Sequence, residues 1–69
     1  MSKYLVVIEK AEKNFAAFCP DLPGCVATGT TKREVERNIR EAITLHLEGL
    51  KEDGLPIPPH TATAEYLAV

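Results

Sequence analysis

The sequence has few of the residues that reinforce small domains. Among its 69 residues are two cysteines and two histidines. Cys19 and Cys25 can form at most one disulfide across a short loop, unlike the dense frameworks of small secreted domains. Together with His46 and His60 they do not show the paired spacing of zinc ligands. We therefore expect free thiols, no bound metal and no other cofactor.

The sequence also lacks long apolar runs and an excess of basic residues. No stretch approaches the ~20 apolar residues that cross a bilayer, and no signal-peptide pattern opens the chain. Eight basic and ten acidic side chains give a net charge of −2, which disfavours a protein that holds a phosphate backbone. We expect a cytoplasmic protein that binds neither membrane nor nucleic acid directly.

The chain length allows a single domain over residues 1–69. A domain of this size buries only about 60% of the surface that its unfolded chain exposes, so its core is small. One such core rarely supplies more than about 3–5 kcal/mol. Since disulfides and bound metal are disfavoured, the remaining source of additional stability is association with other chains. We predict a homodimer or higher homo-oligomer.

Apolar runs and turn residues predict an α+β fold. Short runs rich in β-branched or aromatic residues indicate strands over 4–8, 15–19, 25–28 and 64–68. A helix over 32–53 is indicated by Thr31 and Glu34 in capping-box spacing and by Gly54 as its stop. The expected order is β-β-β-α-β, a small, mostly antiparallel sheet with one amphipathic helix on one face.

The strands are apolar on both of their sides. In the first, Val6 and Ile8 point one way while Leu5 and Val7 point the other, and Phe15 and Phe18 likewise lie on opposite sides of the second. One helix can cover only one face of a sheet. The other face should stay exposed in a monomer, as protein-binding surfaces commonly do.

No arrangement of residues predicts catalysis. Glu9 and Asp21 lie at a strand end and in a turn, so they do not converge as metal-dependent phosphodiester cleavage requires. His46 lies in the apolar arc of the helix, where a packed residue is more common than a general base. Neither cysteine has a neighbour that would depress its pKa, although joint oxidation of the two stays open. We predict that the chain is not an enzyme.

Three motifs resemble the HicB family of antitoxins. They are Pro20-Asp21-Leu22-Pro23-Gly24-Cys25, the following Ala27-Thr28-Gly29-Thr30-Thr31, and the helix end Leu45-His46-Leu47-Glu48-Gly49-Leu50. The resemblance covers residues 3–58. It implies a truncated ribonuclease H-like fold without nuclease carboxylates, which docks a HicA-like, messenger-RNA-cleaving toxin. Many members carry a further C-terminal DNA-binding domain, which we do not expect in these 69 residues.

The predicted contact with the toxin lies at the second strand and the turn after it, from Phe18 to Cys25, together with the free surface of the sheet. Prolines stiffen this turn, so ordering it on binding costs little entropy. The predicted partner-binding residues are Phe18, Asp21, Leu22, Pro23 and Cys25. The alternative is a stand-alone oligomeric binding or scaffold module of the same fold, with no toxin beside it.

Overall fold

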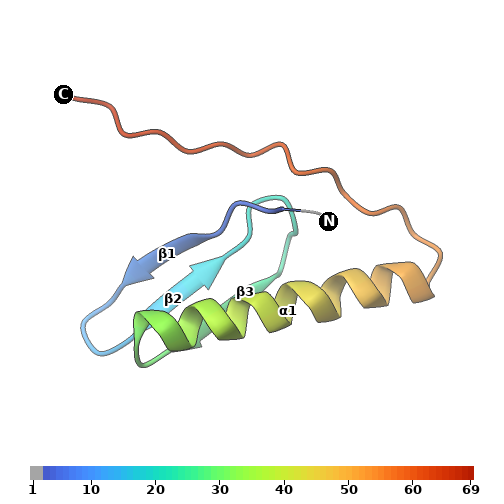
Figure 1. The fold of residues 1–69 in the computed structure, drawn as a ribbon, viewed down its shortest axis with the longest axis horizontal. Helices are drawn as coiled ribbons and strands as arrows, with labels where there is room; N and C mark the ends of the chain where they lie inside the picture. The colour runs from blue at the N-terminus through green and yellow to red at the C-terminus, as the bar shows by residue number, and fades with distance from the viewer. Residues whose placement is uncertain (1–2) are drawn as a thin grey trace.

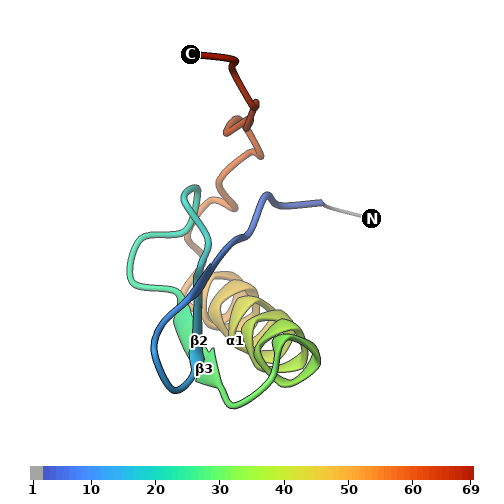
Figure 2. The ribbon, with the colours of Figure 1, turned by 90° about the vertical axis from the view of Figure 1, so that its left-hand side faces the viewer.

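A computed structural model describes residues 3–69 as a three-stranded sheet packed against one helix (Figure 1). The elements are β1 (Val7–Lys10), β2 (Phe15–Phe18), β3 (Val26–Gly29) and α1 (Lys32–Glu52). The strands follow the order β1-β2-β3, and both neighbouring pairs are antiparallel. The helix lies on one side of the sheet (Figure 2). This confirms the predicted α+β class.

The first strand begins later than the sequence indicates. β1 starts at Val7, which pairs with Phe18, and Tyr4 to Val6 lie outside the ladder. The reason lies in the partner strand, because the chain turns directly after Phe18. Cys19 directs its amide to the carbonyl of Cys25 (3.1 Å). Residues before Val7 consequently have no strand beside them.

The fourth strand predicted over residues 64–68 is not formed. After the helix, residues 55–69 carry no regular secondary structure, and Tyr66 and Leu67 are exposed. A strand is stable only when its backbone groups pair with a neighbour. Beyond Ala62, whose amide is bonded to Asp21, the chain leaves the body of the protein instead of lying against the sheet (Figures 1 and 2).

Both helix ends follow the predicted signals, with one difference in detail. The amide of Glu34 donates to the hydroxyl of Thr31 (3.0 Å), while the Glu34 carboxylate accepts from the amide of Thr30 (2.8 Å) and not from Thr31. At the other end Gly54 adopts a φ of 69°. The amide of Gly54 donates to the carbonyl of Lys51, and the amide of Leu55 donates to the carbonyl of Leu50. These two bonds form a Schellman motif. These local interactions fix where the helix begins and ends.

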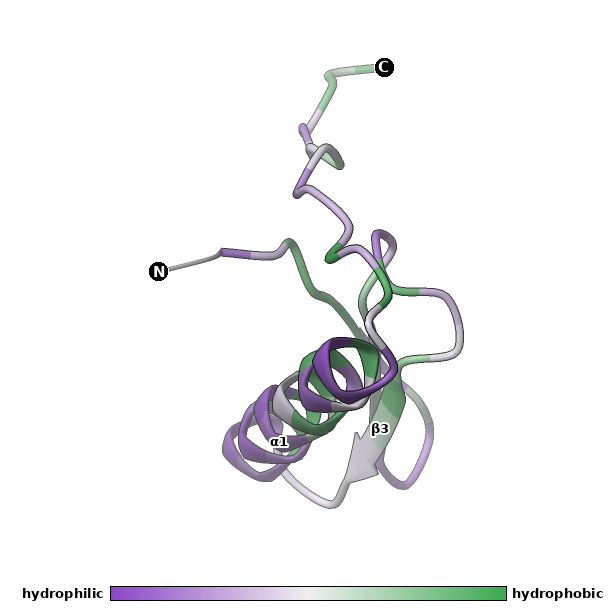
Figure 3. Ribbon diagram, turned by 90° about the vertical axis from the view of Figure 1, so that its right-hand side faces the viewer, coloured by the Kyte–Doolittle hydropathy of each residue, from purple (hydrophilic) through white to green (hydrophobic). Residues whose placement is uncertain are grey.

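The core joins the sheet, the turn after β2 and the helix. Hydrophobic residues of α1 face the strands while its hydrophilic residues face outward (Figure 3). Leu22 and Val35 are completely buried. The prediction that the helix has one apolar face is confirmed. The buried core consists of Ala17, Cys19, Leu22, Cys25, Val35 and Ile39.

Candidate partner-binding surface

The face of the sheet opposite the helix carries an apolar row that the helix does not cover. Val7 lies beside Phe18, and Phe18 beside Val26, so the three form one row across the sheet. Phe18 is 39% exposed and Val26 65%. The next row contains Glu9, Ala16 and Thr28. We call these six residues the open face, and its existence confirms the prediction of a second apolar side.

The two faces differ because the strands alternate. Ile8, Ala17 and Ala27 form the row that points toward the helix, and all three belong to the core or pack against it. Their neighbours along each strand must point the other way. Since α1 is the only helix in residues 3–69, no described element covers the open face.

The turn between β2 and β3 borders the open face and is held from inside. The amide of Leu22 donates to the carbonyl of Cys19 (3.1 Å), and the amide of Cys25 donates to the carbonyl of Leu22 (3.0 Å). Gly24 has a φ of 82°, which a residue with a Cβ rarely adopts. The turn therefore has a defined shape before any partner binds.

Asp21 links this turn to the segment after the helix. Its Oδ2 accepts hydrogen bonds from the amides of Thr61 (3.0 Å) and Ala62 (3.2 Å), and its Oδ1 accepts one from the Thr61 hydroxyl (3.0 Å). Nearby, the hydroxyl of Tyr4 donates to the carbonyl of Pro58 (2.6 Å). Sequence reasoning missed both contacts, because 40 and 54 residues separate the partners.

These hydrogen bonds stabilise the charged form of Asp21. The amide of Ala62 is the main cause that lowers the pKa of the carboxyl group, followed by the hydroxyl and amide of Thr61, and nearby His60 adds a smaller electrostatic contribution. Partial desolvation opposes them. Because the pKa is lower in the folded protein, the contact contributes fully above the pKa of the unfolded chain. It is lost as the pH falls through the lower, folded value.

We expect Asp21→Asn to detach the segment around Thr61 at neutral pH. The amide side chain offers one acceptor oxygen where two are used, and its NH₂ group faces backbone donors. The amide chemical shifts of Thr61 and Ala62 should move toward random-coil values. In the parent protein these chemical shifts should move toward random-coil values only at acidic pH, where Asp21 becomes protonated. Glu12→Gln, which neutralises an exposed acid in the β1–β2 turn, should leave them unchanged; equal shifts in both variants would contradict the anchoring role.

The predicted partner-binding residues do not all lie at the surface. Phe18 lies on the open face, Asp21 is half-buried against the segment after the helix, and Pro23 is exposed. Leu22 and Cys25 are core residues with 0% and 4% exposure. A leucine as the only large apolar residue in a turn with two prolines was a usable signal of burial. In this arrangement these two side chains shape the turn and offer no surface.

The structure adds nothing that would make the cysteines reactive. Cys19 and Cys25 are both buried and unbridged. Burial raises the pKa of the Cys25 thiol, and the neighbouring Cys19 raises it further. A nucleophilic cysteine requires a lowered pKa. The two thiols therefore act as small apolar residues of the core.

Neither acids nor histidines converge on a reactive centre. Within residues 3–69, no three His, Cys, Asp or Glu side chains lie together as metal ligands would. Glu9 is exposed at the end of β1, and His46 is half-buried on the helix. None of the helices in this part of the chain is both long and apolar enough to span a membrane.

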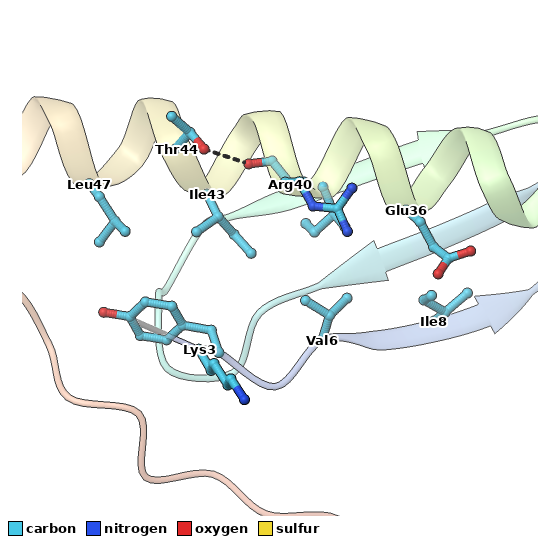
Figure 4. Close-up of a pocket in the computed structure, with 10 residues that line it drawn as sticks. Lys3, Val6, Ile8, Glu36, Arg40, Ile43, Thr44 and Leu47 are labelled. Atoms are coloured by element: carbon cyan, nitrogen blue, oxygen red, sulfur yellow. Dashed lines mark hydrogen bonds between the residues drawn. The ribbon is translucent and has the colours of Figure 1, made fainter. Parts of the chain in front are cut away.

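A second apolar surface is a groove between α1 and the N-terminal part of the sheet. Val6 and Ile8 form one wall, and Ile43 and Leu47 of the helix face them (Figure 4). The exposed charges of Lys3, Glu36 and Arg40 also border the groove. The groove exists because α1 packs on β3 and β2, and leaves the helix-facing side of β1 partly open.

Two proteins of similar sequence come from a phage and from Helicobacter pylori. An uncharacterised 14.9 kDa protein from the rep-hol intergenic region of Haemophilus phage HP1 is 36% identical over 64 residues, which are 93% of this chain and 48% of the phage protein. The chain thus spans about half the length of that relative. A UPF0150 protein of Helicobacter pylori is 51% identical over 49 residues, which are 71% of this chain and 68% of the Helicobacter protein.

A solved structure has the same fold. A chain in the HicA3 and HicB3 toxin-antitoxin complex superposes with a TM-score of 0.71 at 33% identity, over 86% of this chain and 70% of that one. The likeness places the chain in the same small α+β fold as that protein. Residues 4–69 match the family of HicB-like antitoxins of bacterial toxin-antitoxin systems, and the chain belongs to that family. This confirms the resemblance to HicB antitoxins that the sequence motifs indicated, and the family is one of antitoxins and not of enzymes.

Proposed function

We propose that this chain binds a HicA-like toxin through the open face and neutralises it by direct contact. The observation that carries the proposal is the apolar row of Val7, Phe18 and Val26, in which Phe18 and Val26 are exposed and Val7 is half-buried. The chain that carries this row belongs to the HicB-like family. The similarity to a chain of the HicA3 and HicB3 complex supports the choice of partner.

The chemistry of the open face suits such a contact. Phe18 stands in the middle of its row, and a central aromatic side chain is a common hot spot in protein interfaces. Strands fixed by their ladder lose little entropy on binding. Glu9 lies in the adjoining row, and the net charge of −2 favours approach to a basic, RNA-binding partner.

In this proposal the turn after β2 extends the contact. Pro23 and the outer side of Asp21 lie beside the end of the open face, because Phe18 directly precedes the turn. Leu22 and Cys25 contribute by holding the turn in place from the core. A change at Asp21 would also release Thr61, so that residue alone is a poor test of recognition.

Phe18→Asp and Val26→Asp should abolish neutralisation while the domain stays folded. Phe18→Asp places a charge in the middle of the apolar row and Val26→Asp places one at its β3 end. Each costs about 2 kcal/mol or more, which weakens binding by about thirtyfold or more. Leu45→Asp is the matched control, because Leu45 is 68% exposed and Val26 65%, but Leu45 lies on the helix. Relief of growth arrest by the co-expressed toxin and titration calorimetry measure the effect.

The outcomes separate the partner from the surface. If the parent chain fails to bind the basic product of a neighbouring gene, the antitoxin function is wrong and the stand-alone oligomeric module is favoured. If the parent binds and both open-face variants neutralise as well as Leu45→Asp, the function holds and the surface is wrong. Circular dichroism of every variant shows that the fold is retained.

A further inference from the structure

The segment over residues 63–69 has the composition of a strand but no partner. Ala64, Tyr66 and Ala68 alternate with Glu65 and Leu67. Tyr66, Leu67 and Val69 are largely or fully exposed. The segment leaves the body in an extended form (Figures 1 and 2). Three apolar side chains exposed on one extended segment form a surface that a protein contact would bury.

The free edge of β1 and the apolar groove beside it form a site that could accept an added strand. Among the described strands β1 pairs only with β2, so its other edge is free. The groove lies beside that edge, with Val6 and Ile8 opposite Ile43 and Leu47. An unpaired edge beside an apolar groove binds extended segments by adding a strand, with pockets for alternate side chains.

We infer that the segment over residues 63–69 of a second copy of this chain adds to β1 and places Tyr66 in the groove. The exchange is reciprocal, and each copy donates one segment and accepts one. On the groove side Tyr66 stands between Ala64 and Ala68, so one large side chain enters between two small ones. Its hydroxyl then lies near the polar groups that border the groove, among them Glu36 and Arg40.

A second copy fits better than the chain's own segment. Asp21 holds Thr61 and Ala62 beside the body, yet the residues that follow still turn away from it. Pro56, Pro58 and Pro59 favour an extended linker and disfavour folding back. Exchange of identical segments between protomers is a common route to dimers under these conditions. The added strand pairs with the edge of β1 and brings Leu67 to the open-face side beside Val7 and Glu9. The exchange needs no toxin, so this inference does not depend on the proposed function.

Tyr66→Ser should weaken the dimer about thirtyfold, as loss of a buried aromatic anchor does. Leu45→Ser removes a large exposed apolar side chain outside the groove and should leave the dimer unchanged. Light scattering and sedimentation velocity across micromolar concentrations measure both. A monomeric parent chain, or a dimer equally stable in the Tyr66→Ser variant, would overturn the inference.

Disulfide trapping between two chains of different size distinguishes exchange from docking within one chain. One chain carries Val7→Cys or Glu9→Cys and the other, longer by a tag, carries Leu67→Cys. Cys19 and Cys25 are buried and should not compete. Mild oxidation of the mixture should give a covalent heterodimer, and Leu45→Cys in place of the β1 cysteine should not. A single chain with both new cysteines that closes on itself, as an oxidised monomer, would show docking in cis and refute the exchange.

Discussion

Val35→Asp is expected to unfold the domain, whereas Val26→Asp is expected to leave it folded. The two valines differ in environment, since Val35 has 0% exposure and Val26 65%. A buried carboxyl group without a partner costs several kcal/mol whether it stays charged or takes up a proton. A single small core supplies about 3–5 kcal/mol. The substitution at Val35 therefore removes about all of the stability of the fold.

The replacement at Val26 has a different cost. The side chain of Val26 lies on the open face. The free energy of unfolding falls there mainly because aspartate has a lower strand propensity than valine, which costs about 1 kcal/mol or less. Far-UV circular dichroism and urea unfolding measure both variants. Val35→Asp should show no cooperative transition, and Val26→Asp should unfold at a slightly lower urea concentration. A cooperative transition near that of the parent in Val35→Asp would contradict the burial of this residue.

The pair also supports the functional test. A toxin contact is lost trivially when the antitoxin unfolds, so only a folded open-face variant is informative. Val26→Asp and Val35→Asp both replace a valine by an aspartate, but Val26 lies on the open face and Val35 lies in the core on the helix side of the sheet. Loss of neutralisation by Val26→Asp with its fold intact would separate recognition from folding.

Local patterns in the sequence predicted the parts of the fold that local forces decide. Thr31 and Glu34 cap the helix within one turn, and Gly54 ends it through bonds to the preceding turn. Alternation along each strand gave the two faces of the sheet, because the period of side chains in a strand is two. These features need no knowledge of which elements meet in space.

Contacts between distant residues could not be predicted in this way. Asp21 has the composition of a turn residue, and nothing near it in sequence indicates Thr61 as its partner. The strand expected at 64–68 has suitable residues, but pairing depends on a neighbouring edge and not on the segment alone. Leu22 and Cys25 were assigned to a surface turn, and the way their side chains point is decided by the core. The candidate site was therefore predicted as a region, and its exposed residues required the structure.

Gly29→Ala is expected to destabilise the fold strongly, and Gly49→Ala to stabilise it. A Cβ atom at Gly29 would lie 2.6 Å from the backbone nitrogen of Val35 and 2.9 Å from its Cα, in the first turn of α1. Positive φ angles occur only at Gly24 and Gly54 among the described glycines, so the backbone at Gly29 would itself accept alanine. The expected damage is steric, since β3 and the start of the helix would have to separate.

Overpacking of this kind costs about 1–3 kcal/mol, and the upper end applies because backbone atoms cannot rotate away. At Gly49 a Cβ atom meets nothing within 4 Å, and alanine in a helix gains about 0.5–1 kcal/mol over glycine. The same substitution thus has opposite signs at the two positions. Urea unfolding monitored by circular dichroism should place Gly49→Ala above the parent and Gly29→Ala well below it. If Gly29→Ala unfolds at the same urea concentration as the parent, then β3 and α1 do not approach as closely as the contact between Gly29 and Val35 requires.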